Sequence, residues 1–138
     1  MSSLSRRDIK IVQRDWAKVE RIADTAATLF YDRLFAMDPS VRPLFKGDMA
    51  AQKVKLIRML GAAIYGLRDT DVLLPILRHL GQKHARLGVR DEHYTTVGVA
   101  LIETLRQGLG TGFDAENEAA WTRVYGVLAE AMKGTGDS

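Results

Sequence analysis

The amino-acid sequence predicts an all-α protein, and three observations support this prediction. Apolar residues recur at steps of three and four along most of the chain, which is the spacing of one helix face. No useful length alternates strictly between apolar and polar residues, and only three prolines interrupt the 138 residues. The length and the 46% hydrophobic fraction suit one soluble domain. We therefore expect about seven helices, packed on one another in a single domain over residues 1–138.

The first two helices are predicted from their apolar stripes. The first begins after Ser5, whose hydroxyl can cap it, with Asp8 in the acidic position of a capping box. The second spans about residues 22–37 and carries Tyr31 beside its apolar face. The stripes consist of Ile9, Val12, Trp16 and Val19 in the first helix and of Ile22, Ala26, Leu29, Phe30 and Leu34 in the second.

Two further helices follow a turn. Asp38 can end the second helix and cap the next, and proline at position 39 suits a first helical residue. A short helix over residues 39–45 is therefore predicted. Asp48 can then cap a longer helix that reaches about residue 67.

The second half of the chain contains three more predicted helices. Asp71 is expected to cap the first of them, which tolerates Pro75 near its first turn. Gly88 closes it, and Asp91 and Asp114 are expected to cap the other two. The inner stripes are Leu73, Leu77, Leu80, His84 and Leu87, then Tyr94, Val97, Leu101 and Leu105, then Trp121, Val124, Tyr125, Leu128 and Met132.

Composition excludes several classes of function. The chain has no cysteine, which excludes disulfides, thiolate metal sites and a cysteine nucleophile. The net charge is +3, but basic residues alternate with acidic ones and form no run of the length that binds nucleic acid. No apolar run is long enough for a membrane span or a signal peptide. We expect a cytoplasmic protein that contacts neither nucleic acid nor membrane.

Three histidines are the best candidates for a metal ligand or a general base. His79 and His84 are five residues apart, about 140° around a helix, so they cannot bind one metal from the same face. His84 continues an apolar stripe, where its ring needs a partner. Either it is a core histidine that hydrogen-bonds a neighbour, or it is an axial haem ligand. His93 has no such placement.

Other residues also have two interpretations. Gln52 and Leu56 lie one above the other on a helix, so Gln52 either donates into a cavity that Leu56 narrows or is solvated. Tyr31 either sends its hydroxyl outward or points it at a bound ligand. Phe45 by itself indicates core packing. Motifs for a serine nucleophile, a P-loop or a dinucleotide fold are absent.

Taken together, these segments resemble the globins over nearly the whole chain. The resemblance is greatest to bacterial single-domain globins, to the globin domain of flavohaemoglobins and to neuroglobin. It lies in the segments FYDRLF (30–35), PSVRPLF (39–45), LLPILRHLGQKHARLGV (73–89), HYTTVG (93–98) and AAWTRVYGVLAEAM (119–132).

The resemblance implies a globin fold of seven to eight helices around haem b. His84 then matches the proximal iron ligand, and Phe45 the residue that stacks on the haem. Tyr31 and Gln52 match the two distal positions that contact bound O2, with Leu56 one turn beyond Gln52. Tyr94 matches a tyrosine on the proximal side, and Lys55 the place of a basic residue near a haem propionate. Leu80, Val89 and Val97 complete the expected cofactor contacts.

The sequence departs from this pattern at three points. Gln52 stands where many globins have a distal histidine, so ligation by two histidines loses its usual sixth ligand. The glutamate that flavohaemoglobins link to the proximal histidine falls at about Gly136 here, so a strong electron push from the proximal side is not implied. The flavohaemoglobin reductase portion is not within these residues.

The resemblance implies O2 binding, for storage, transport or sensing, with tight binding from Tyr31 and Gln52. CO and NO are further expected ligands. The alternative is an NO dioxygenase that depends on a separate reductase, and a haem-free helical interaction module is a third possibility. We expect a monomer or a weak homo-oligomer.

Overall fold

The computed structural model describes residues 4–134, and these residues form six α-helices and three 3-10 helices without a strand. The prediction of an all-α fold is confirmed. In chain order the elements are α1 (Arg6–Glu20), α2 (Ala23–Met37), η1 (Pro39–Leu44), α3 (Met49–Tyr65), η2 (Gly66–Arg68), α4 (Thr70–Arg86), α5 (Asp91–Leu109), η3 (Gly110–Gly112) and α6 (Ala115–Lys133).

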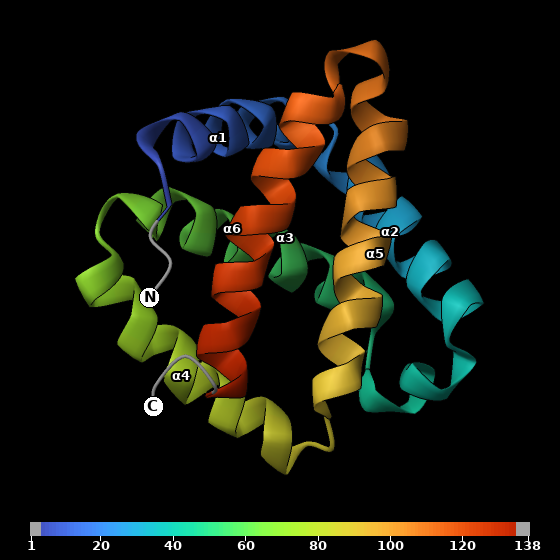
Figure 1. Cartoon of the computed structure of the whole chain (residues 1–138). Coiled ribbons are helices and arrows are strands. Elements are labelled where there is room, and N and C mark those ends of the chain that lie inside the picture. Colours follow the sequence, from blue (N-terminus) through green and yellow to red (C-terminus); the bar gives the residue numbers. More distant parts are fainter. Residues whose placement is uncertain (1–3, 135–138) are drawn as a thin grey trace.

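Helix α6 is the element around which the others are arranged. It packs against α1, α4 and α5, and α2 packs on α5. In Figure 1, α5 and α6 run side by side in opposite directions, α1 crosses one end of α6 and α4 crosses the other. The amino end of α5 therefore lies on the same side of the molecule as α4 (Figure 1).

The core lies where α1, α2, α5 and α6 meet, and it contains both tryptophans. The rings of Trp16 and Trp121 are almost completely buried, with their centroids 6.5 Å apart. Val12, Val19 and Leu34 of the predicted stripes are also buried. Each such side chain contributes about 1.5–3 kcal/mol when it is removed from water, so this cluster explains why α1 packs on α6.

The predicted caps of three helices are confirmed. The Ser5 hydroxyl accepts from the backbone N–H of Asp8 at 3.0 Å, and Asp48 accepts from Ala50 at 3.1 Å. Asp114 caps α6 by accepting from two backbone N–H groups. The Asp8 carboxylate takes no part in a capping box, because it pairs with Arg123 of α6.

Two other predicted caps are wrong. Helix α4 starts at Thr70 and has Asp69 at its cap position, so Asp71 lies within the first turn. A carboxylate there still favours the helix, because it faces the positive end of the helix dipole. Helix α5 starts at Asp91 itself, and the Nδ1 atom of His93 accepts from the backbone N–H of Arg90 at 2.9 Å. His93 is buried in this capping role.

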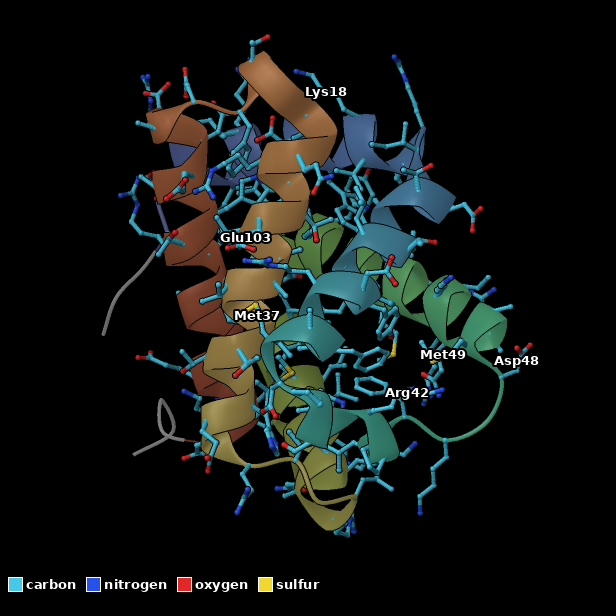
Figure 2. The ribbon with its side chains drawn as sticks, turned by 90° about the vertical axis from the view of Figure 1, so that its right-hand side faces the viewer. Lys18, Met37, Arg42, Asp48, Met49 and Glu103 are labelled. Carbon is cyan, nitrogen blue, oxygen red and sulfur yellow. The ribbon has the colours of Figure 1, made fainter. Side chains whose placement is uncertain are left out.

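The turn between α2 and α3 contains the predicted short helix, which is a 3-10 helix. Asp38 accepts from the backbone N–H of Ser40, and Pro43 lies inside the element. Figure 2, in which Met37, Arg42 and Asp48 are labelled, shows from the side how the chain leaves α2 and returns as α3. Within residues 4–134, no helix combines the length and apolar character that a membrane crossing requires.

Candidate functional site

The imidazole of His84 is half-buried on α4 and is held through one of its two nitrogens. Its Nδ1 atom lies 3.3 Å from the hydroxyl oxygen of Tyr94, and the two ring centroids are 6.4 Å apart. Within the described part of the chain, Nε2 makes no hydrogen bond to the protein. One nitrogen thus lies at hydrogen-bond distance from a tyrosine while the other has no protein partner, which is the arrangement of a histidine that can bind a metal.

The orientation of His84 follows from the packing of α4, whose other inner residues are buried against the rest of the protein. Leu73 and Leu77 are buried, and so is Gly81 one turn before the histidine. The predicted stripe does not continue past His84, because Leu87 is 62% exposed. It lies at the carboxyl cap of α4, where the chain turns away toward α5.

The other two histidines lie elsewhere. His79 is on an exposed face of α4, and His93 caps α5. Among residues 4–134 no group of three potential metal-ligating side chains is close enough to hold an ion. His84 therefore offers a single imidazole, a donor set that suits a haem iron better than a protein zinc site.

The charge environment of His84 comes from two helices. Burial lowers the pKa of its imidazole, and the positive charges of Lys55 and Lys83 lower it further. Lys55 is exposed on α3 and Lys83 on α4, so α3 and α4 both reach the surroundings of this ring. A low pKa keeps the imidazole neutral at physiological pH, and the neutral form is the one that can bind a metal.

On the side of α2, Tyr31 lies within a cluster of aromatic rings. Its ring meets Phe30 and Phe45 edge to face, with centroid distances of 5.2 and 5.3 Å, and Phe35 lies 5.7 Å away. Burial raises the pKa of Tyr31 to about 12. The phenol is therefore protonated at all physiological pH values and can donate a hydrogen bond.

Tyr31 and Gln52 meet at the first turn of α3. The Tyr31 hydroxyl lies 3.5 Å from the backbone carbonyl oxygen of Gln52, to which it donates. The Gln52 side chain donates from Nε2 to the carbonyl oxygen of Lys46 at 3.1 Å. The Tyr31 hydroxyl therefore reaches the backbone of Gln52, and the side-chain amide of Gln52 is hydrogen-bonded to the loop before its helix.

The other expected cofactor contacts fall into two groups. Leu56, Val97 and Phe45 are half-buried and pack against the core cluster. Leu80 and Val89 are half-buried on α4 and on the turn that follows it. The turn is close to η1, since a Cβ on Gly88 would lie 3.4 Å from the Leu44 side chain.

These residues fit a haem. The donor set is one neutral imidazole with an available Nε2, which suits an axial ligand. The side chains expected around it are mostly apolar, and the buried phenol of Tyr31 is a hydrogen-bond donor. Such a site can hold a porphyrin by burial and can stabilise a polar ligand at the metal.

The sequence did not indicate that Tyr125 and Gly81 belong to this site. Tyr125 was expected only as an inner residue of α6, yet its hydroxyl donates to the backbone carbonyl of Tyr94 at 2.5 Å. Gly81 lies against the backbone of α6 at Met132. The signal available in the sequence was weak: a glycine inside a helical stripe and a tyrosine on an inner face.

Comparisons with known proteins agree with this geometry. A family model described as globin matches residues 28–132. The chain is 28% identical over 134 residues to a flavohemoprotein of Bacillus subtilis, covering 95% of this chain and 34% of that protein. It is 35% identical over 108 residues to flavohemoproteins of Bordetella parapertussis and Bordetella bronchiseptica, covering 76% of this chain and 27% of each relative. The chain thus spans about a third or less of these relatives' length.

A solved structure supports the same fold. It is an engineered carbene transferase made from a candidate nitric oxide dioxygenase of Rhodothermus marinus, with a TM-score of 0.84 and 24% identity. The likeness covers 98% of this chain and 94% of that one. The family match covers most of the chain and includes Tyr31, Gln52, His84 and Tyr94. The chain therefore belongs to the globin family, and its cofactor is haem b.

Proposed function

We propose that this globin binds O2 at a haem whose axial ligand is His84, and that Tyr31 stabilises the bound ligand. The observation that supports this most directly is the half-buried imidazole with Nδ1 at Tyr94 and Nε2 available. A haem held by His84 would supply an iron atom that can bind a diatomic ligand such as O2, CO or NO. The protein residues orient that iron and select the ligand.

On the proximal side, Tyr94 fixes the orientation of His84. When Nε2 binds a metal, the proton of the neutral ring lies on Nδ1, which then donates to the Tyr94 oxygen at 3.3 Å. Such a hydrogen bond holds the ring plane and makes the imidazole a stronger donor to the metal. Lys55 and Lys83 oppose protonation of the ring, and so they favour the ligating form.

On the distal side, Tyr31 is the better placed of the two donors. Its hydroxyl is almost fully buried and its present contact with the Gln52 carbonyl is long, at 3.5 Å. Gln52 already uses its Nε2 in a 3.1 Å bond to Lys46. Phe45 and Phe35 keep water away from the phenol, and a hydrogen bond is worth more where water is excluded.

NO dioxygenation is a second candidate, because the similar proteins include flavohemoproteins and a candidate nitric oxide dioxygenase. In that reaction NO, O2 and one electron give nitrate, so each turnover needs an electron from outside the site. These 138 residues hold no dinucleotide-binding glycine motif. An electron donor outside these residues would therefore have to supply the electron.

The first experiment is haem reconstitution of His84→Ala, with His79→Ala as its control on the same helix. We expect the wild type and His79→Ala to take up haem with a Soret band and to bind O2 and CO reversibly. His84→Ala should lose haem binding or release haem many times faster. Unchanged haem uptake and O2 binding in His84→Ala would contradict the proposal.

The two candidate functions are separated by NO consumption. With a flavin reductase and NADH, a dioxygenase consumes NO and O2 over many turnovers and accumulates nitrate. A protein that only stores or transports O2 gives a single stoichiometric event and stops. The same reductase with His84→Ala measures the background rate.

A further inference from the structure

Helix α6 packs against both helices that carry the pair His84 and Tyr94, which we call the proximal pair. It packs on α4, which carries His84, and on α5, which carries Tyr94. Figure 1 shows the carboxyl half of α6 beside the amino end of α5, with α4 crossing next to it. The separation between His84 and Tyr94 therefore depends on how closely α6 approaches each of these two helices.

On α5, the close approach is made at Gly98, one turn after Tyr94. A Cβ atom at Gly98 would lie 2.7 Å from the ring of Tyr125, which is nearer than real side-chain contacts allow. The Tyr125 ring is thus seated directly on the backbone of α5. Only glycine at position 98 leaves room for it.

From this seat Tyr125 reaches the residue that contacts the histidine. Its hydroxyl donates to the backbone carbonyl oxygen of Tyr94 at 2.5 Å. Burial raises the pKa of Tyr125 well above its ordinary value, so the phenol stays protonated and keeps donating. The carbonyl of Tyr94 is also the helical i−4 acceptor for the backbone N–H of Gly98. Tyr125 therefore fixes the backbone position of Tyr94 relative to α6.

On α4, the corresponding contact is at Gly81, which lies three residues before His84. A Cβ atom there would overlap the carbonyl oxygen and carbonyl carbon of Met132 on α6. The backbones of the two helices are in direct contact at this point, so the distance between α4 and α6 can vary little. Gly126 is different: it also lies on α6, but a Cβ there would meet nothing within 4 Å.

We propose that Tyr125, whose ring packs on Gly98, is a positioning residue for the pair His84 and Tyr94. We also propose that Gly81 fixes the distance of α4 from α6. Through these contacts α6 holds the Tyr94 hydroxyl at hydrogen-bond distance from Nδ1 of His84. This inference rests on the proposed role of His84 as the haem ligand. Its consequence is that residues without contact to His84 control the strength of its bond to the metal.

The test uses Tyr125→Phe, which keeps the ring on Gly98 and removes only the hydroxyl. In the haem-loaded ferrous protein we expect a lower Fe–His stretching frequency and a higher Fe(III)/Fe(II) midpoint potential, both in the direction that Tyr94→Phe produces. The shift in potential should correspond to about a two- to tenfold change in the ferrous-to-ferric ratio, the range that one neutral hydrogen bond contributes. In a Tyr94→Phe background, Tyr125→Phe should have no further effect.

Two outcomes would overturn the inference. One is a stretching frequency that responds to Tyr94→Phe and is unchanged in Tyr125→Phe. The other is a Tyr125→Phe shift of the same size with and without Tyr94, which would mean that Tyr125 acts by another route. If the wild type has no Fe–His band at all, the proposed function itself fails, and that result is distinct from both.

A glycine series provides a second, independent measurement. Gly98→Ala forces the Tyr125 ring to move, so it should shift the Fe–His frequency in the same direction as Tyr125→Phe. Gly126→Ala is the matched control, because it adds the same methyl group to open space, and it should leave the frequency unchanged. Equal Fe–His stretching frequencies in Gly98→Ala and Gly126→Ala would contradict the role of the contact between Tyr125 and Gly98. Gly81→Ala should give the largest loss of stability of the series.

Discussion

The carboxylate of Asp8 accepts two hydrogen bonds of 2.8 Å from the guanidinium group of Arg123, and this pair joins α1 to α6. The carboxylate is buried while the arginine is largely exposed. The hydrogen bonds from Arg123 lower the pKa of Asp8, and burial opposes them. Folding therefore favours the ionised carboxylate.

This pair predicts a defined dependence of stability on pH. Because the pKa of Asp8 is lower in the folded chain than in the unfolded chain, its contribution is fully present above about pH 4 and is lost as the pH falls through the folded pKa. Asp8→Asn should reduce the free energy of unfolding at pH 7 by about 1–3 kcal/mol and reduce the acid sensitivity. Urea unfolding at pH 7 and at pH 3 measures both effects, with the exposed Asp32→Asn as control. Equal acid sensitivity in wild type and Asp8→Asn would refute the prediction.

A second carboxylate on α1 is buried, and its hydrogen-bond donors within residues 4–134 are uncharged. Asp15 is 1% exposed and accepts hydrogen bonds from Asn117 at 2.9 and 3.1 Å and from the Trp121 indole at 3.0 Å. Asp15→Ala leaves both donors without an acceptor, so we expect a loss of about 2–4 kcal/mol in unfolding free energy. Asp15→Asn retains one acceptor oxygen and should lose less. Thermal unfolding of the two variants tests the order, and equal losses would show that charge, not hydrogen bonding, dominates.

Removing the Tyr31 hydroxyl should accelerate release of O2. The phenol is buried among aromatic rings and protonated, and a hydrogen bond to a partly charged ligand contributes about 1.5–3 kcal/mol. Tyr31→Phe should therefore raise the O2 dissociation rate about 10- to 100-fold, while CO, which is less polar, should be affected much less. Stopped-flow measurements of both ligands on the ferrous protein provide the comparison. An O2 rate that matches the wild type would remove Tyr31 from the ligand site.

Gln52 should have a smaller effect than Tyr31. Its Nε2 atom donates to the Lys46 carbonyl, so only a second N–H of the amide remains for a ligand. Gln52→Leu should raise the O2 dissociation rate by less than Tyr31→Phe does, and it should also loosen the segment before α3. Stopped-flow O2 dissociation measures the first effect, and the rate of proteolysis within residues 45–48 measures the second. A larger effect from Gln52→Leu would mean that its amide turns toward the ligand.

The amino-acid sequence by itself determined the helical fold, most helix limits and the residue types of the site. Helical spacing of apolar residues identified the stripe that carries His84, and Ser5, Asp48 and Asp114 identified three caps, because both signals are local. The resemblance to globins depended on the same local segments. The glutamate position expected at Gly136 lies outside the described residues, so it stays a prediction.

Tertiary structure decided everything that depends on distance between helices. It assigned Asp8 to an ion pair with Arg123 of α6 and not to the capping box at Ser5. It exposed Leu87, because the chain turns at the end of α4. It also brought Tyr125 of α6 against Tyr94 of α5. Helix periodicity records which face of a helix is buried, but the partner on that face is fixed only when the helices pack.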